Sequence, residues 1–178
     1  STAPPTVVES SPWHERAQMP TRRAYIAVAV AERRILAIAG QTPEGVTGAV
    51  EIYDPEDDLW TRGSSKPVPV TYVSAAVIAS DVYVPGGCDA EGTPIRTVEV
   101  YDVASDTWRE VSPLPQPRCA YALTSWDEKL YLFGGWDGER YVATVYVYDP
   151  QADAWSEGIP METKQGFAAA AALRDRLY

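Results

Sequence analysis

Histidine and cysteine are scarce in this 178-residue chain, which has one His and two Cys. His14 alone offers little material for a histidine base, a catalytic triad, or a zinc or copper site. Cys88 and Cys119 are too few for a disulfide framework and lack the spacing of metal ligands, so we expect each to be a small, semi-apolar residue near a strand end. The sequence therefore predicts no metal, no cofactor and no enzymatic centre within this segment.

Long apolar runs are also missing. No stretch of 18 or more apolar residues exists, so no segment is expected to span a bilayer. Residues 1–12 lack the charged and apolar regions of a signal peptide, and we expect them to form a flexible N-terminal segment. Together these absences favour a cytoplasmic location.

Basic charge is in short supply. The chain has 15 Lys and Arg against 25 Asp and Glu, for a net charge of −10. Nucleic acids and anionic membranes both require a basic surface on the protein that binds them. The composition therefore excludes these two classes as the main partner.

What the chain does contain is a repeat. A Tyr-Asp pair followed by Trp recurs three times, with the Trp seven residues after the Tyr, as Tyr53-Asp54…Trp60, Tyr101-Asp102…Trp108 and Tyr148-Asp149…Trp155. A doublet of small residues recurs with the same period of 47 to 48, as Ala39-Gly40, Gly86-Gly87 and Gly134-Gly135. A unit of this length is typical of one four-stranded module that buries its faces by stacking on its neighbours.

Four short strands and three turns are predicted in each repeat. In the third copy the strands are Cys119–Trp126, Leu130–Phe133, Ala143–Tyr148 and a fourth that Trp155 opens. The first copy gives 25–30, 35–39, 50–53 and 59–61, and the second gives 72–79, 82–84, 98–101 and 107–110. No segment shows sustained helical spacing, so the sequence predicts an all-β fold of antiparallel sheets.

The recurring residues suit structural roles in a sheet that is covered on both faces. Tyr and Trp supply large areas that wedge between sheets while their polar groups find partners. Glycine permits a close backbone approach and unusual φ angles at the end of the second strand. We assign such roles to Tyr53, Tyr101, Tyr148, Trp13, Trp60, Trp108, Trp155, Gly40, Gly86, Gly87, Gly134 and Gly135.

With these motifs the chain resembles the kelch repeat family. The matching features are the Gly-Gly doublet, the Tyr-Asp pair, the Trp seven residues after that Tyr, and an Arg sixteen residues before the doublet, which is Arg23 in the first copy and Arg118 in the third. The second copy departs from the pattern because Val70 replaces this Arg, and the first doublet begins with Ala39. The resemblance implies a β-propeller of four-stranded blades that serves mostly as a binding platform.

The register of the repeat divides the chain. Residues 13–178 form the expected propeller segment: 13–18 as the outer strand of a partial blade, 19–66, 67–114 and 115–162 as complete blades, and 163–178 as the start of a further blade. The first and last pieces could combine to close a four-bladed ring. A fragment of a larger propeller is the favoured interpretation, and it predicts contacts with the rest of the propeller or self-association.

One face of the propeller is predicted to bind the ligand. It carries the connectors between blades and the long loops 41–48, 88–96 and 136–142, whereas the acidic side chains gather in the turns of the opposite face. The candidate binding residues are Arg22, Arg23, Tyr72, Arg96, Arg118, Trp136, Asp137, Arg140 and Tyr141. The resemblance places Arg23 and Arg118 at the ring mouth, where they would hold the carboxylates of an acidic peptide. The alternative is that each Arg pairs with a carboxylate of a neighbouring blade.

The predicted function is a kelch-type module that binds a protein or peptide, and Arg23 and Arg118 favour an acidic one. One alternative is an extracellular or periplasmic propeller that recognises carbohydrate, because exposed Trp and Tyr can stack on sugar rings. Another is the non-catalytic part of a larger kelch enzyme, since the family includes copper radical oxidases and sialic acid mutarotases. A copper site needs several His and Tyr ligands, which one histidine cannot provide in this segment.

Overall fold

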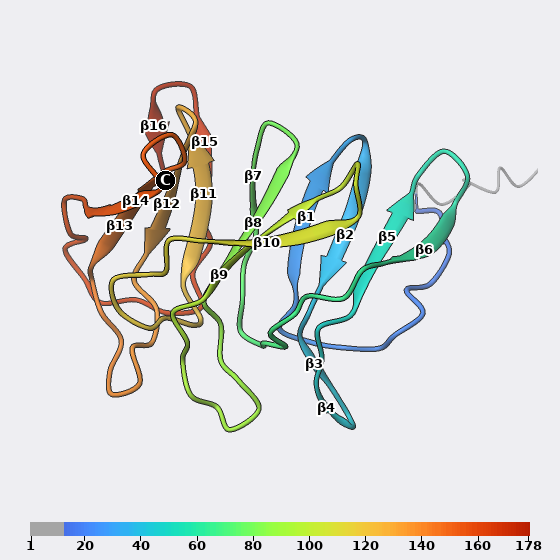
Figure 1. Ribbon diagram of the computed structural model, residues 1–178, viewed down its shortest axis with the longest axis horizontal. Coiled ribbons are helices and arrows are strands. Elements are labelled where there is room, and N and C mark those ends of the chain that lie inside the picture. Colours follow the sequence, from blue (N-terminus) through green and yellow to red (C-terminus); the bar gives the residue numbers. More distant parts are fainter. Residues whose placement is uncertain (1–12) are drawn as a thin grey trace, which may run out of the picture.

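Antiparallel sheets make up the whole fold of the computed structural model, which describes residues 13–178. The predicted flexible segment, residues 1–12, lies outside this range. No helix occurs among the described residues, and three four-stranded sheets stand side by side as blades (Figure 1). The predicted all-β fold with three complete blades is confirmed.

The strands follow one up-and-down order in every blade. The first blade consists of β1 (Ala27–Ala31), β2 (Arg34–Ile38), β5 (Val50–Asp54) and β6 (Leu59–Gly63). The second consists of β7 (Ala76–Ile78), β8 (Asp81–Pro85), β9 (Val98–Asp102) and β10 (Thr107–Val111). The third consists of β11 (Ala122–Trp126), β12 (Lys129–Phe133), β13 (Val145–Asp149) and β14 (Ala154–Glu157).

Two short hairpins complete the fold. The loop between β2 and β5 folds into β3 (Gln41–Thr42) and β4 (Gly45–Val46), which the sequence did not predict. After the third blade, β15 (Ala172–Leu173) pairs with β16 (Arg176–Leu177), as expected for the start of a further blade.

Residues 13–18 differ from the prediction, because they are not a strand. A strand needs a partner strand with which to share backbone hydrogen bonds, and no strand of the described residues pairs with this segment. Nor does the segment pair with the β15–β16 hairpin, so it does not complete a four-stranded sheet there. Two hydrogen bonds, to Asp58 and Trp60, instead attach Ala17 to the first blade.

The first strand of each blade begins later than predicted. Tyr25, Tyr72 and Ala120 have φ angles of 55°, 53° and 53°, outside the range of a β-strand. The backbone needs this left-handed residue to carry hydrogen bonds between blades: the amide of Ala120 donates to Tyr72 O, and the amide of Phe167 donates to Ala120 O, both at 2.8 Å. The apolar pattern predicts where these runs lie but not the turn within them.

The core lies between the blades. The inner strand β7 contacts both β1 and β11, and β11 contacts β15. Large side chains on the second and third strands and the connectors are fully buried between sheets, among them Leu36, Ile38, Tyr101, Leu114, Leu130, Leu132 and Tyr148. Burial of this apolar area is the main favourable contribution to the stacking of the blades.

The Tyr-Asp…Trp motif fastens each blade to the segment before it. In the second blade the hydroxyl of Tyr101 donates to Asp106, whose carboxylate also accepts the amide of Ser64 at 2.6 Å. The indole of Trp108 donates to the carbonyl of the same Ser64 at 2.8 Å. The first and third blades form the same three hydrogen bonds. In the first blade Tyr53, Asp58 and Trp60 do so with Ala17 as the partner, and in the third Tyr148, Asp153 and Trp155 do so with Ser112. The structural roles predicted for these residues are thereby given specific partners.

The glycine doublets allow neighbouring blades to meet. Gly86 and Gly87 have φ angles of 61° and 102°, and a Cβ on Gly86 would collide with the carbonyl oxygen of Arg118 in the next blade. The amide of Gly87 donates to that same carbonyl at 2.8 Å. A side chain here would separate two backbones that are hydrogen bonded to each other.

Candidate functional site

One end of the blades carries the connectors and the loops between second and third strands, as Figure 1 shows for the β3–β4 hairpin and the two loops beside it. We call this end the loop face. The turns between first and second strands and between third and fourth strands lie at the opposite end (Figure 1). The two predicted faces are therefore present.

A row of aromatic rings follows the left-handed residues of the blades. The rings of Tyr25 and Tyr72 lie 4.2 Å apart, and those of Tyr72 and Phe167 lie 5.7 Å apart. Phe167 also approaches Tyr141 at 6.3 Å, and Tyr141 meets Trp136 at 5.2 Å. We call these five residues the aromatic row. It extends across three blades and the start of the next.

The third blade interrupts this row with a small residue. Ala120 stands at the position that Tyr25, Tyr72 and Phe167 occupy in the other repeats. A hollow of 230 Å³ lies there, lined by Tyr72, Cys88, Gly92, Cys119, Ala120, Trp136, Tyr141 and Phe167. Tyr25, Tyr141 and Phe167 remain 51%, 40% and 64% exposed, which is unusual for rings that contact one another. The arrangement suits a ligand that presents an apolar or flat group.

Sequence reasoning included Tyr72, Trp136 and Tyr141 in the site but missed Tyr25 and Phe167. The sequence did contain a signal for them: Tyr25 and Phe167 occupy the same position of the repeat, two residues after the one that Arg23 and Arg118 occupy. The ring of Trp136 contacts that of Tyr141 within the same loop. Trp136 is half-buried and still lines the hollow.

A disulfide joins Cys88 to Cys119 beneath the hollow, with Cα atoms 5.5 Å apart. The expectation that each cysteine is an independent small residue is wrong. Cys88 follows the glycine doublet of the second blade, and Cys119 lies just before the first strand of the third blade. Their proximity therefore arises from the stacking of the blades and not from their spacing in the sequence. The bond links the two blades that carry most of the hollow.

Arg23 does not point into the ring mouth. Its guanidinium is fully buried, lies 3.1 Å from a carboxylate oxygen of Glu51, and donates to the carbonyls of Ala49 and Ala37 at 2.6 and 2.9 Å. Burial lowers the pKa of Arg23, and the charge of Glu51 opposes that effect. Arg23 is therefore not directed at the ring mouth as predicted, and the alternative is not met either, because Glu51 belongs to the same blade and not to a neighbouring one. These contacts hold the connector against β2 and β5.

The second blade builds the same ion pair from different residues. Val70 replaces the Arg, but Lys66, four residues earlier, reaches the buried carboxylate of Glu99 with its ammonium group and also donates to Val68 O at 2.9 Å. Burial lowers the pKa of Lys66, and Glu99 acts in the opposite direction. The blade that lost its Arg has therefore kept a cation at this place.

The remaining predicted basic residues are distributed over the loop face. Arg22 and Arg140 are exposed, and Arg140 lies within 3.9 Å of Asp137. Arg96 donates a hydrogen bond to Leu114 O at 2.6 Å. Asp137 accepts the amides of Glu139 and Arg140. Burial opposes ionisation of this carboxyl, but these hydrogen bonds and the nearby charges of Arg118 and Arg140 leave its pKa below the usual value. Arg118 is buried and has no carboxylate partner among the described residues.

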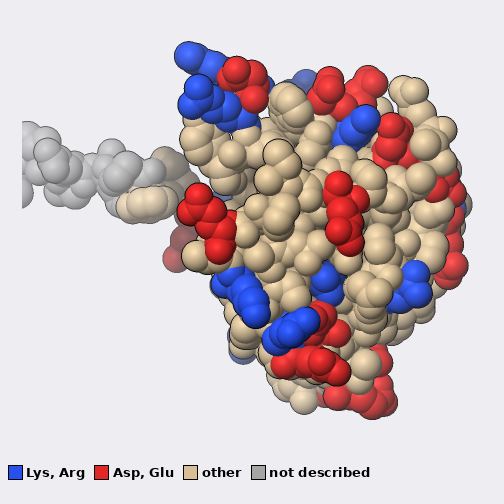
Figure 2. All heavy atoms as spheres, turned by 90° about the vertical axis from the view of Figure 1, so that its left-hand side faces the viewer, with Lys and Arg blue, Asp and Glu red and all other residues tan. Residues whose placement is uncertain are grey.

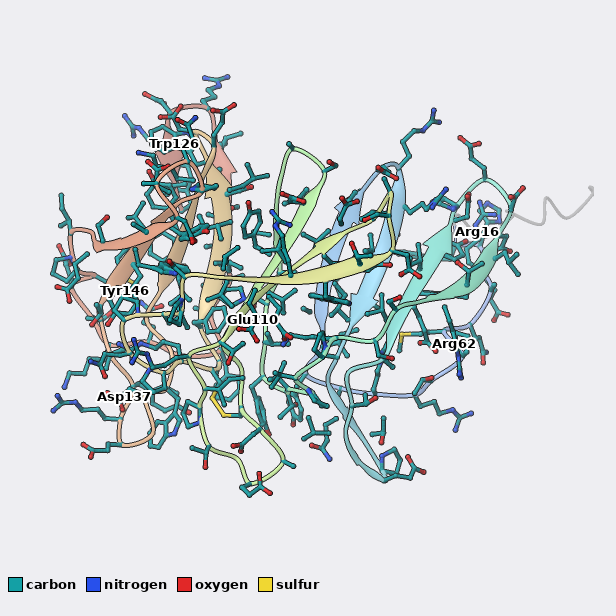
Figure 3. The ribbon with its side chains drawn as sticks, in the orientation of Figure 1. Arg16, Arg62, Glu110, Trp126, Asp137 and Tyr146 are labelled. Atoms are coloured by element: carbon teal, nitrogen blue, oxygen red, sulfur yellow. A yellow bond between two sulfur atoms is a disulfide. The ribbon has the colours of Figure 1, made fainter. Side chains whose placement is uncertain are left out.

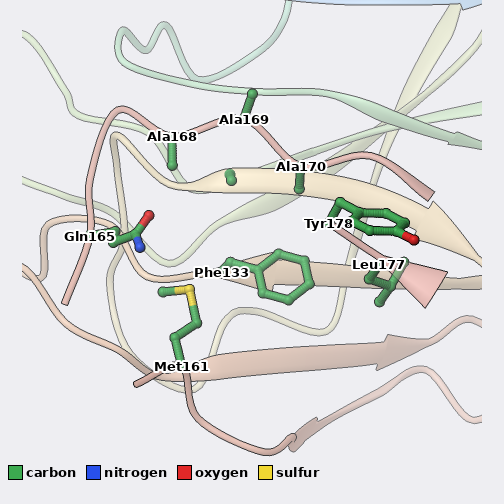
Figure 4. A pocket seen from close by; sticks show the side chains of 9 residues that line it. Phe133, Met161, Gln165, Ala168, Ala169, Ala170, Leu177 and Tyr178 are labelled. Carbon is green, nitrogen blue, oxygen red and sulfur yellow. The ribbon is translucent and has the colours of Figure 1, made fainter. Parts of the chain in front are cut away.

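A further cavity is mainly apolar. The cavity in Figure 4, of 280 Å³, lies between the third blade and the following hairpin, and small or apolar side chains such as Phe133, Met161 and Leu177 line most of it. Among residues 13–178, no group of His, Cys, Asp and Glu side chains is arranged to hold a metal ion. The same residues include no helix long and apolar enough to cross a membrane.

Comparison with known proteins identifies the family. The model described as the KLHDC2/KLHL20/DRC7 Kelch-repeats domain matches residues 62–178, and the Kelch motif model matches residues 22–67. The chain belongs to the kelch-repeat family.

Kelch relatives extend well beyond the segment that they share with this chain. Alpha-scruin of Limulus polyphemus is 31% identical over 135 residues, which cover 72% of this chain and 15% of the scruin. Kelch-like protein 33 of Homo sapiens is 28% identical over 80 residues, which cover 45% of this chain and 15% of that protein. The chain thus spans only a small part of the length of these relatives.

A solved structure shares the arrangement of blades. The structure of YjhT superimposes with a TM-score of 0.79 at 16% sequence identity, covering 89% of this chain and 58% of that one. At this identity the likeness establishes the fold alone. The kelch-type propeller architecture is thereby confirmed.

Proposed function

We propose that this kelch-repeat segment binds a protein or peptide through the aromatic row on its loop face. The observation that carries the proposal is the exposure of mutually contacting rings beside a hollow, since apolar groups that contact one another are normally buried. Aromatic residues near the centre of an interface commonly supply most of its binding energy. Ala120 leaves the space into which an apolar side chain of the ligand would insert.

The supporting structure is rigid around this row. Backbone hydrogen bonds connect Tyr72, Ala120 and Phe167 from blade to blade, and the Cys88–Cys119 disulfide lies below them. A site whose groups are already in place costs less conformational entropy when the ligand binds. Arg22, Arg96 and Arg140 are exposed, and exposed charges influence association more than affinity.

A selection from a phage-displayed random peptide library tests the proposal. We expect peptides with aromatic or branched aliphatic anchors to be enriched on the wild-type chain, and Trp136→Ala to weaken their binding by tenfold or more, as truncation of a central aromatic does. Asp57→Ala, on the opposite end of the first blade, is the matched control and should bind normally. If the selected peptides bind the Trp136→Ala and Phe167→Ser variants as well as wild type, the aromatic row is not the site.

A second candidate function is recognition of carbohydrate outside the cytoplasm, and the disulfide favours it. Disulfides persist mainly in secreted and periplasmic proteins, and their presence argues against the cytoplasmic location that the sequence favours. The same exposed rings can stack on sugars. A glycan array with wild type and Trp136→Ala separates the two functions, because only a carbohydrate site would retain glycans in a ring-dependent manner.

A further inference from the structure

The three blades differ at one buried position of their third strand. The second residue of that strand is Glu51 in β5, Glu99 in β9 and Tyr146 in β13. All three side chains are almost completely buried. The third blade therefore has a tyrosine where the other two have a carboxylate.

Each of the two carboxylates is paired with a buried cation, Glu51 with Arg23 and Glu99 with Lys66. The third blade has kept its cation, Arg118, although the acid is absent. The guanidinium of Arg118 lies 5.3 Å from the centre of the Tyr146 ring and donates to Pro117 O at 2.8 Å and to the Tyr146 hydroxyl at 3.5 Å. Its Nε is buried without a hydrogen-bond partner, as is the Nε of the ion-paired Arg23.

Burial of the Arg118 guanidinium is energetically unfavourable in this arrangement. Arginine cannot lose its proton in a protein, so burial does not neutralise the charge. The charge of Arg118 is close enough to lower the pKa of Asp137, but Asp137 forms no ion pair with the guanidinium, so the desolvation cost of Arg118 is only partly offset. The planar guanidinium is matched best by a carboxylate, which can accept two parallel hydrogen bonds.

A cavity of 430 Å³ opens onto this guanidinium. Besides Arg118 and Tyr146, it is lined by Gln116, Asp137, Glu139, Arg140, Val142 and Thr144. In Figure 3, Tyr146 lies on β13 and Asp137 lies below it in the loop between the second and third strands. Figure 2 shows acidic and basic side chains mixed at the lower end of this side of the molecule, where that loop lies. The cavity is thus polar, open and bordered by both signs of charge.

Tyr146 is suited to help bind an anion. Burial raises the pKa of its hydroxyl, which therefore stays protonated at neutral pH. The hydroxyl oxygen accepts from Arg118, and no acceptor for its own hydrogen is found among the described residues. That hydrogen is available to a ligand oxygen, as are the amide of Gln116 and the hydroxyl of Thr144.

We propose that this cavity binds a single carboxylate group of a ligand, held by the guanidinium of Arg118 and the hydroxyl of Tyr146. The ligand carboxylate takes the role that Glu51 and Glu99 fulfil within their own blades. Asp137 and Glu139 on the rim disfavour a phosphate dianion, since they would repel its second charge. The site does not require that the aromatic row bind a protein, so the two proposals fail independently.

Melting temperature measured at constant ionic strength tests the site with defined probes. Sodium acetate, replacing sodium chloride, should raise the melting temperature if a free carboxylate enters the cavity. N-acetylaspartate amide compared with N-acetylasparagine amide tests whether an aspartate side chain does so, and its greater effect would identify a polypeptide as the source. Sodium phosphate should give a smaller shift than acetate. Equal melting temperatures in acetate, in the aspartate probe and in chloride would overturn the proposal.

Tyr146→Glu is the decisive variant, because it supplies the carboxylate internally as in the first two blades. We expect it to melt at a higher temperature than wild type and to lose the response to acetate and to the aspartate probe. Ala154→Glu, with the same added charge on exposed β14, is the matched control and should keep the wild-type response. An undiminished response in Tyr146→Glu would also overturn the proposal.

Tyr146→Phe keeps the test decisive if Tyr146→Glu does not fold. This variant retains the ring over Arg118 and removes only the hydroxyl. Loss of one hydrogen bond to a charged group should weaken acetate binding about tenfold. Unchanged acetate binding by Tyr146→Phe would exclude the hydroxyl from the site.

Discussion

The hydroxyl of Tyr101 donates to the carboxylate of Asp106, and this carboxylate at the same time accepts the backbone amide of Ser64 from the connector of the preceding blade. Tyrosine and aspartate are five residues apart in the sequence, but they join two blades. The same relationship connects Tyr53 with Asp58 and Tyr148 with Asp153. One local motif therefore produces the contact on which a repeat architecture depends.

Asp106→Ala should destabilise the chain by about 2 kcal/mol, because Tyr101 and Ser64 both lose their acceptor and the φ of 52° is unfavourable for alanine. Asp106→Asn is the matched control, since it keeps an acceptor oxygen and tolerates the left-handed backbone. We expect about half the loss for Asn. Urea unfolding monitored by Trp fluorescence measures both. Equal losses for the two variants would contradict the role of the shared acceptor.

Acid should destabilise the protein through these same carboxylates. The pKa of Asp106 is lowered by the hydrogen bonds from Ser64 and Tyr101, that of Asp58 by Tyr53 and Ala17, and that of Asp153 by Tyr148 and Ser112. A pKa lower in the folded state than in the unfolded state means that the unfolded chain binds more protons in this range. The stabilisation is thus present above the ordinary Asp pKa of about 3.9 and is lost as the pH falls through the lower folded values.

Urea midpoints measured from neutral pH to about pH 3 test this dependence, because the window lies below the ordinary Asp pKa. The decrease on acidification should be smaller in Asp106→Asn than in wild type, because Asn has no proton to bind. A parallel decrease in both proteins would assign the acid sensitivity to other carboxylates.

The substitution of Lys66 for the missing Arg makes a specific rescue possible. Lys66→Met should destabilise the chain by about 3 kcal/mol, because it leaves the carboxylate of Glu99 buried without its cation. The double variant Lys66→Met, Val70→Arg reproduces Met19 and Arg23 of the first blade and should recover much of that loss. Val70→Arg alone is the control for packing, since Gly87 lies directly against Val70. Urea unfolding of the four proteins forms a double-mutant cycle, and a coupling energy near zero would contradict the proposed replacement.

The disulfide should stabilise the chain by closing a long loop. Cys88 and Cys119 are 31 residues apart, for which loop-closure entropy gives about 3.7 kcal/mol. The Cys88→Ser, Cys119→Ser double variant should therefore unfold at lower urea, and a reducing agent should lower the wild-type midpoint to about the same place. A reducing agent should leave the double variant unaffected. Identical midpoints for wild type with and without reductant would contradict a stabilising disulfide.

The repeat made the strands predictable from the sequence. Tyr-Asp and Trp mark the third and fourth strands, and the glycine doublet marks the end of the second, because each performs a local task that only a few residue types can perform. β5, β9, β13 and their neighbours accordingly lie within one or two residues of the predicted bounds. The start of the first strand was less accurate, since the left-handed turn at Tyr25, Tyr72 and Ala120 serves hydrogen bonds to the next blade.

The candidate site was decided by tertiary structure. Arg23 and Arg118 occupy the same position of the repeat, so the sequence does not distinguish them. In the structure Arg23 is paired with Glu51, whereas Arg118 contacts Tyr146 and lines a cavity. The disulfide and the contact between Tyr72 and Phe167 likewise join residues of different blades. The sequence by itself determined the register of the repeat, because register depends on local turns and alternating burial. The stacking of the blades determined which charges are neutralised and which rings meet, because those outcomes depend on groups that are distant along the chain.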